Sequence, residues 1–129
     1  MITELIQTKY YVSFLIGRNG EFDECAASVI KRVRKEKGKE NSDITLVLPY
    51  AVADLEYYEG YYDSIVIPEV ASCAHPKSAI TLKNRWMIQQ SDLVIVLVEH
   101  ETGGAHQAIK YAKRLHKRVI NLCEIPYEQ

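Results

Sequence analysis

Five short hydrophobic segments, rich in β-branched residues, recur along the chain and predict five β-strands. They cover residues 10–16, 44–48, 64–67, 93–98 and 118–123. The fourth segment, Leu-Val-Ile-Val-Leu-Val, has no polar position, whereas a strand with one wet face alternates apolar and polar residues. This continuous run indicates a strand that is covered on both faces, as in the centre of a parallel sheet.

The segments between these strands have the periodicity of amphipathic helices. The first apolar stripe consists of Phe22, Cys25, Ala26, Val29, Ile30 and Val33. The last consists of Ala105, Ala108, Ile109, Ala112 and Leu115. A third helix is expected from Lys77 or Ser78 to Gln90, with Ala79, Leu82 and Trp86 facing inward. A shorter helix is expected over residues 51–59.

Strands that alternate with helices at this spacing predict stacked β-α-β units with right-handed crossovers. The expected fold is therefore α/β, a three-layer α/β/α sandwich around a five-stranded, mainly parallel sheet. A chain of 129 residues is typical of one domain, and no linker, repeat or low-complexity tract divides it. We expect one domain over residues 1–129.

Composition excludes several classes of protein. Apolar residues make up 47% and charged residues 26%, which is typical of a globular chain and not of a disordered one. The net charge of -1 gives no whole-chain attraction to nucleic acid or anionic lipid, although a local patch is compatible with it. We therefore do not expect nucleic acid as a partner. No apolar run approaches the roughly 20 residues of a membrane span.

Three unclustered cysteines, an odd number, argue against a disulfide framework and favour a reducing compartment. The first residues lack the basic start and apolar stretch of a signal peptide. We expect a soluble cytoplasmic protein. Four histidines and the pair Cys73 and His75 do not form a recognisable set of metal ligands, so no metal site is expected.

Ligands of open parallel sheets bind beyond the carboxyl ends of the strands. That rule selects three loops: one that contains Gly17, Arg18 and Asn19, a second with Pro49 and Tyr50, and a third over residues 99–104. In the third loop, the pair Gly103 and Gly104 lets backbone N–H groups approach an anion, and the following helix adds its positive end. The alternative is a tight turn that needs a positive φ.

Several other loop and helix residues each have two interpretations, as a ligand contact or as a surface residue. Arg18 either pairs with a phosphate through its planar guanidinium or is a solvated turn residue. Asn84 and Arg85, late in the third helix, either reach the ligand or lie along the surface. Glu99 and Glu101 offer carboxylates for acid–base chemistry. No Gly-x-Gly-x-x-Gly or Walker-type motif is present, so ordinary dinucleotide and P-loop mechanisms are not expected.

Five tyrosines lie close together in the sequence: Tyr50, Tyr57, Tyr58, Tyr61 and Tyr62. Amphipathic rings favour subunit interfaces or core packing over ligand stacking. Tyr50 is the exception, because its loop position favours contact with a base or a sugar.

Several segments together resemble the YpsA-like branch of the SLOG superfamily, over about residues 11–122. They are Ile44-Thr45-Leu46-Val47-Leu48-Pro49-Tyr50, Asn84-Arg85-Trp86-Met87-Ile88, Ser91-Asp92-Leu93-Val94-Ile95, Gly103-Gly104-Ala105, Ile109-Lys110-Tyr111-Ala112 and Ile120-Asn121-Leu122. The resemblance implies a Rossmann-like fold that binds nucleotides or nucleotide-derived ligands in the loops described above. Together with the tyrosines, it favours a homodimer.

The superfamily includes the DNA-processing protein DprA and the LOG phosphoribohydrolases, whose motif Pro-Gly-Gly-x-Gly-Thr-x-x-Glu ends in a catalytic Glu. Arg85 matches the Arg that works with this motif, and Gly103 and Gly104 match its paired glycines, with Thr102 in place of the Pro. Lys110 stands where the catalytic Glu would be. A cationic Lys does not stabilise positive charge on a ribosyl ring, so hydrolysis of the LOG type is not expected.

The expected function is therefore binding, as a sensor or carrier of a small phosphorylated ligand, with no cofactor required. Ala105 and His106, in the first turn of the last helix, complete the expected site. One alternative is N-glycosidic hydrolysis or transfer that uses Glu99 or Glu101. Another is a protein-interaction scaffold without a small ligand.

Overall fold

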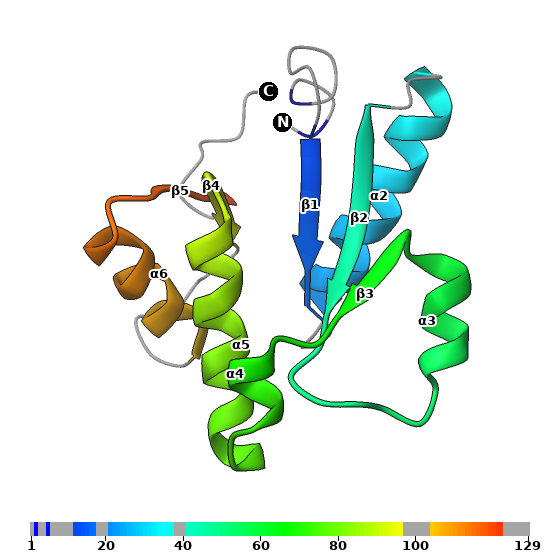
Figure 1. Ribbon diagram of the computed structural model, residues 1–129. Helices are drawn as coiled ribbons and strands as arrows, with labels where there is room; N and C mark the ends of the chain where they lie inside the picture. Colours follow the sequence, from blue (N-terminus) through cyan, green and yellow to red (C-terminus); the bar gives the residue numbers. More distant parts are fainter. Residues whose placement is uncertain are drawn as a thin grey trace.

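The structure, a computed structural model of the chain, describes residues 2, 5, 12–17, 21–37, 41–96 and 104–122. Strands and helices alternate along the chain, as the sequence predicts (Figure 1). They are β1 (Val12–Ile16), α2 (Glu21–Lys37), β2 (Ser42–Val47), α3 (Leu55–Tyr61), β3 (Ser64–Val66), α4 (Glu69–Ser72), α5 (Pro76–Gln90), β4 (Leu93–Val96), α6 (Gly104–Arg114) and β5 (Arg118–Asn121).

The five strands form two parallel sheets, not the single five-stranded sheet expected from the sequence. One sheet has the order β1-β2-β3, with Val12 opposite Ser42 and Ile16 opposite Leu46; the other pairs β4 with β5. In the described part of the chain, β1 and β4 are not hydrogen-bonded to each other. The apolar pattern of a strand predicts that it is covered, but not which strand lies beside it. The α/β class and the parallel pairing are confirmed.

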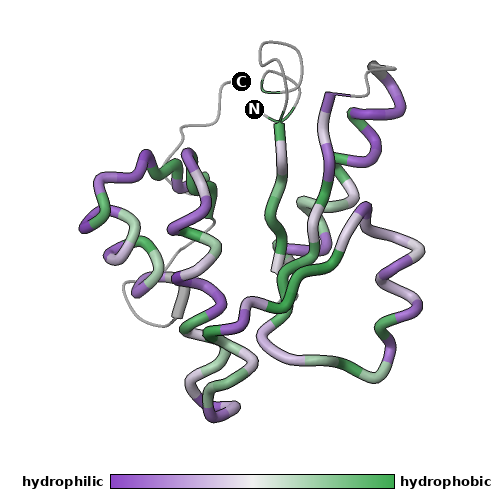
Figure 2. The backbone as a smooth tube through the Cα atoms, viewed as in Figure 1, coloured by the Kyte–Doolittle hydropathy of each residue, from purple (hydrophilic) through white to green (hydrophobic). Residues whose placement is uncertain are grey.

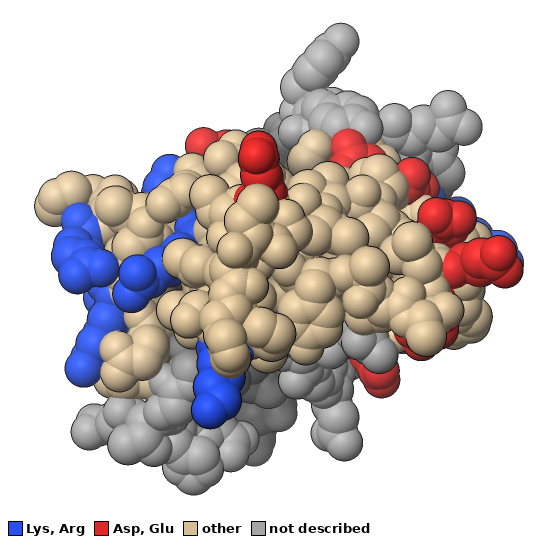
Figure 3. Space-filling model, turned by 60° about the horizontal axis from the view of Figure 1, so that its bottom comes forward, with Lys and Arg blue, Asp and Glu red and all other residues tan. Residues whose placement is uncertain are grey.

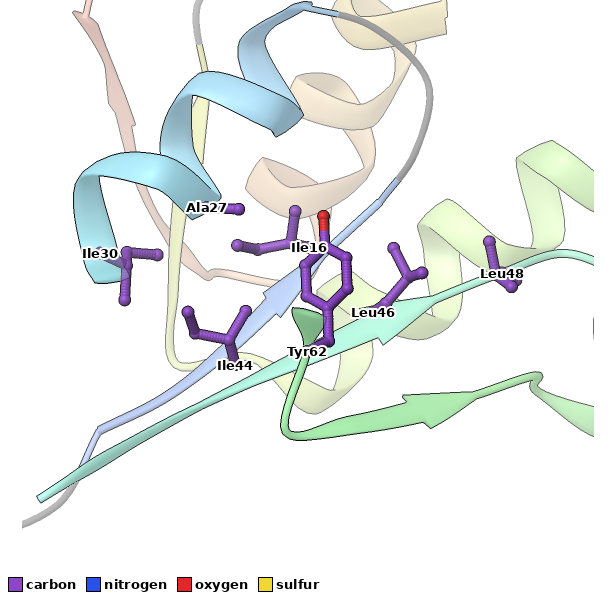
Figure 4. Close-up of a cluster of buried hydrophobic side chains, with 7 residues drawn as sticks. All are labelled: Ile16, Ala27, Ile30, Ile44, Leu46, Leu48 and Tyr62. Carbon is purple, nitrogen blue, oxygen red and sulfur yellow. The ribbon is translucent and has the colours of Figure 1, made fainter. Parts of the chain in front are cut away.

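The central strand β2 is the most deeply buried element, because it has a neighbouring strand on each edge and α2 packed against it. Its side chains Ile44 and Leu46 lie on the same side of the sheet as Ala27 and Ile30 of α2 (Figure 4). The full cluster of buried side chains is Ile16, Ala27, Ile30, Ile44, Leu46, Leu48 and Tyr62. Figure 2 shows the same division, with hydrophobic strands and a largely hydrophilic outer face on α2.

The buried stripe of α2 differs in one respect from the expected one. Ala27, Ile30 and Val33 face the core, whereas Cys25 is exposed. Ile30 and Val33 thus belong to the expected stripe, and Ala27 is buried in place of Cys25. Both faces of this helix contain small or apolar side chains. The sequence period therefore predicts only approximately which residues are buried.

The short helix α4 was not expected, because four residues are too few to show a helical period. It begins after Pro68 and packs against α5. The expected helix over residues 51–59 is present but begins later, at Leu55. Across the described residues, no helix combines the length and apolarity needed to cross a membrane.

Candidate functional site

The carboxyl end of β1 leads directly into the start of α2. Gly17 follows the last residue of the strand and is buried, and α2 begins at Glu21. Arg18 and Asn19, expected to contact a ligand, lie outside the described residues. The carboxyl end of β1 is thus followed within four residues by the N-terminus of α2, and open parallel sheets bind ligands beyond such strand ends.

Lys83, in the middle of α5, is the most unusual side chain of this region. Its side chain is fully buried, with 0% of its surface exposed, in a structure where the other fully buried side chains of comparable size are aliphatic. Its Nζ atom has no hydrogen-bond partner among the described residues. A buried ammonium group without partners is costly, because it has lost its hydration without gaining hydrogen bonds.

Two opposing effects act on this ammonium group. Burial, the larger effect, lowers the pKa of Lys83 below its ordinary value of 10.5. The nearby charge of Asp23 raises the pKa of Lys83 and favours the protonated form. Asp23 is half-buried in the first turn of α2. The charge that acts on Lys83 thus belongs to the first turn of α2, the helix that follows β1 along the chain.

The sequence indicated the position of Lys83 but not its role. We expected Ala79, Leu82 and Trp86 to face inward, and the structure shows Ala79 buried and the other two half-buried. Lys83 follows Ala79 by four residues, so both lie on the same helix face. A lysine within an apolar stripe is a signal for a buried cation. We did not predict the burial of Lys83, because lysine side chains usually extend to solvent.

Arg85 lies on a different side of α5. Two residues are separated by about 200° around a helix, so Arg85 and Lys83 point in nearly opposite directions. Arg85 is exposed, and its guanidinium carbon is 5.2 Å from the centre of the Tyr111 ring in α6. The structure therefore does not bring Arg85 together with Lys83, and its contact with a ligand stays a prediction. Asn84, between them, is half-buried.

The loop after β2 lies at the carboxyl end of the same sheet. Pro49 is buried, and Tyr50 is 43% exposed. Leu48 donates its N–H to the carbonyl oxygen of Val66 at 2.9 Å, which continues the parallel pairing one residue beyond β2. The chain leaves the sheet after this bond. Tyr50 is therefore accessible beyond the strand end, as the ligand hypothesis requires.

The last expected loop is only partly described. Helix α6 begins at Gly104, so the second glycine of the expected diglycine starts the helix. Ala105 follows in the first turn, and His106 is half-buried. Thr102 and Gly103 lie outside the described residues, as do the carboxylates Glu99 and Glu101. Lys110 is exposed on α6.

No group of three His, Cys, Asp or Glu side chains within the described ranges is arranged to hold a metal ion. Cys25 and Cys73 are free and exposed. Since the sequence offers Cys73 no evident base partner, we expected a buried or half-buried, inert thiol, whereas the structure shows an exposed one.

No family model, curated protein or solved structure matches the chain. The resemblance to the SLOG superfamily therefore stays a prediction from the quoted motifs.

Proposed function

We propose that the protein binds a small phosphorylated ligand, a nucleotide or a nucleotide derivative, at the carboxyl end of β1. The observation that carries this proposal is the buried Nζ of Lys83, which has no hydrogen-bond partner among the described residues. An anionic ligand would supply both the missing hydrogen bonds and a compensating charge.

The surroundings of Lys83 favour an anion of this class. Asp23, whose charge acts on this ammonium group, lies in the first turn of α2, and the backbone N–H groups and dipole of a helix start attract negative charge. Phosphate groups bind at such helix starts in many nucleotide-binding proteins. Asp23 helps to keep Lys83 protonated despite its burial, as an anion-binding group requires.

The proposed site extends over the neighbouring loops. We assign Gly103 and Gly104, with the start of α6, to a second phosphate contact, and Arg18 to charge pairing. Tyr50, exposed beyond β2, would stack on the base or the sugar. In this proposal the two parallel sheets are the halves of a Rossmann-like, three-layer arrangement. The ligand would lie where the halves meet, between β1 and β4.

Isothermal titration calorimetry with AMP, ADP-ribose and a cyclic dinucleotide tests the proposal. We expect at least one of them to bind with a dissociation constant below about 1 mM, which corresponds to about −4 kcal/mol. Lys83→Met should abolish this binding, because it removes the buried cation. Gly104→Asp should weaken it, because it adds a side chain and a negative charge to the start of α6.

The variant Lys35→Met is a matched control, since Lys35 is exposed on α2 and its replacement removes the same charge. It should bind as the natural protein does. The proposal fails if none of the three ligands binds more tightly than about 1 mM, or if Lys83→Met binds as well as the natural protein.

A cytoplasmic location belongs to the same proposal. The exposed free thiols of Cys25 and Cys73 are compatible with a reducing compartment, where such groups persist without oxidation. Cell fractionation should recover the protein with the cytosolic markers. Recovery from the secreted or membrane fraction would contradict this assignment.

A further inference from the structure

The last part of the described chain gathers cations on one surface. Residues 104–122 contain five Lys or Arg residues and no Asp or Glu. Figure 3 shows basic side chains gathered at one end of the molecule, the end that α6 forms in Figure 1. The net charge of -1 does not reveal this concentration, because acidic residues elsewhere in the chain balance it.

Contacts between α5 and α6 hold several of these cations together. The guanidinium carbons of Arg85 and Arg114 each lie 5.2 Å from the centre of the Tyr111 ring. The hydroxyl group of Tyr111 accepts a hydrogen bond from the side chain of Gln89 at 2.8 Å, and the backbone carbonyl of Gln89 accepts one from Lys117 at 3.4 Å. The cations of two helices and of the turn after α6 therefore lie side by side.

Two further lysines extend this surface along α6. Lys110 precedes Lys113 and Arg114 by three and four residues, so the three share one side of the helix. All three are exposed, whereas Ile109 and Ala112 are buried. Within the described ranges, none of these three cations has an acidic partner. We call the following residues the basic patch: Arg85, Lys110, Lys113, Arg114 and Lys117.

An exposed leucine borders the basic patch. The helical period predicts Leu115 in the buried stripe of α6, whereas the structure shows it 38% exposed. His116 has a φ of 59°, and the N–H of Lys117 donates to the carbonyl oxygen of Ala112 at 2.9 Å. This geometry is the common left-handed ending of a helix, with His at a position that usually carries Gly. Leu115 is therefore part of an ordered turn, directly after Arg114.

We propose that the basic patch binds an acidic segment of a partner protein, which also packs an apolar side chain against Leu115. Carboxylates suit the planar guanidinium groups of Arg85 and Arg114, because each guanidinium can donate two parallel hydrogen bonds to a carboxylate. Lys110 and Arg114 repel each other at a spacing of four residues, and a carboxylate between them would relieve this repulsion. The contact needs no ligand at the proposed nucleotide site.

The surface favours an acidic protein segment over a nucleic acid. Single-stranded nucleic acids gain affinity from bases that stack on aromatic side chains. Tyr111, the one Tyr, Phe or Trp within the described residues 104–122, is half-buried, and its ring already contacts two guanidinium groups. A phosphate backbone offers no apolar group to Leu115. The patch would therefore bind a nucleic acid through charge alone.

Fluorescence anisotropy with three labelled probes tests the proposal. Two are peptides as long as the 11 residues of α6, built from Asp and Glu around a central Leu or a central Ser. The third is a poly(U) RNA of the same number of units. In about 50 mM NaCl, we expect the Leu peptide to bind with a dissociation constant below about 100 μM. In about 500 mM NaCl its binding should weaken about tenfold or more. The RNA should bind at least about tenfold more weakly than the Leu peptide.

Charge reversals within the patch test where the peptide binds. Lys110→Glu and Lys113→Glu should each weaken binding of the Leu peptide by about tenfold or more, because they replace attraction with repulsion. Lys35→Glu makes the same charge change on the exposed side of α2 and should change the dissociation constant by less than about twofold. Circular dichroism of the variants, expected to match the natural protein, shows that they are folded.

Leu115→Ser completes a double-mutant cycle with the two peptides. It should weaken the Leu peptide about fivefold and leave the Ser peptide unchanged, because the two leucines contact each other. Unchanged binding of the Ser peptide also shows that this variant is folded. Binding of the Leu peptide weaker than about 100 μM in low salt would overturn the proposal, as would equal effects of Lys113→Glu and Lys35→Glu. An equal effect of Leu115→Ser on both peptides would also overturn it. Tighter binding of the RNA than of the Leu peptide would assign the basic patch to nucleic acid instead.

Discussion

The ammonium group of Lys83 in α5 and the carboxylate of Asp23 in α2 attract each other, although Nζ forms no hydrogen bond with any described residue. The attraction keeps the buried lysine more readily protonated than burial alone would allow. It does not satisfy the three N–H donors of the ammonium group. The folded protein therefore holds a buried cation whose lost hydration is not replaced by hydrogen bonds from the described residues.

Replacement of Lys83 by Met should stabilise the protein in the absence of ligand. The buried charge lacks hydrogen bonds, and an apolar side chain of similar size removes that cost while it fills the same space. We expect the free energy of unfolding, measured by urea denaturation at pH 7, to rise by about 1 kcal/mol or more. The control Lys35→Met should change it by less than about 0.5 kcal/mol. A Lys83→Met variant that unfolds more easily would show that the lysine stabilises the fold.

The stability of the protein should rise with pH because of Lys83. The pKa of Lys83 is lowered by burial in the folded state, whereas the unfolded chain has the ordinary value of 10.5. Between these two values, the unfolded chain binds a proton that the folded protein lacks, so the free energy of unfolding increases with pH. Urea denaturation from pH 7 to pH 10 should show this increase in the natural protein and a smaller one in Lys83→Met. Equal slopes would contradict the lowered pKa.

Tyr62 should have the opposite effect at higher pH. Burial, assisted by the charge of Tyr61, raises the pKa of Tyr62 from 10.0 to about 12. The unfolded chain then loses the phenolic proton near pH 10, whereas the folded protein keeps it until about pH 12, so stability falls across this interval. Thermal unfolding at several pH values between these limits should show a smaller loss for Tyr62→Phe. The same loss in both proteins would exclude Tyr62 as its source.

Asp63 joins the segment after α3 to the central strand. Its Oδ2 atom accepts a hydrogen bond from the N–H of Ile44 at 2.8 Å and another from Arg34, and its own N–H donates to the carbonyl oxygen of Ile44 at 3.0 Å. Asp63→Ala leaves the N–H of Ile44 without its carboxylate partner, so we expect a loss of about 1–3 kcal/mol in urea denaturation. Arg34→Ala should cost less than about 1 kcal/mol, because the ion pair is partly exposed. A larger effect for Arg34→Ala would reverse this ranking.

The hydrophobic pattern predicts the elements of this fold well, because burial of one stripe or of both strand faces directly determines which residues are apolar. The apolar run that begins at Leu93 is a strand, and the helix expected to end at Gln90 ends there. The pairing of strands is harder to predict from the sequence, since β1 has the same apolar residues whether or not β4 lies beside it. The separation into two sheets therefore required the structure.

The sequence likewise predicts some parts of the candidate site, whereas others are known only from the structure. The loops at the carboxyl ends of the strands follow from the order of the elements, and the buried Gly17 confirms where one of them begins. The burial of Lys83 depends on which side of α5 packs against the rest of the molecule, a property of packing and not of composition. The resemblance implies a ligand contact for Arg85, which stays a prediction; the structure shows this residue exposed, with its guanidinium group over the ring of Tyr111.

A crystal structure of the protein with the tightest-binding nucleotide tests the central claim most directly. We expect a phosphoryl oxygen within hydrogen-bond distance of Nζ of Lys83, at the carboxyl end of β1 and beside the first turn of α2. A nucleotide bound elsewhere, with Lys83 still buried and without a ligand contact, would contradict the account.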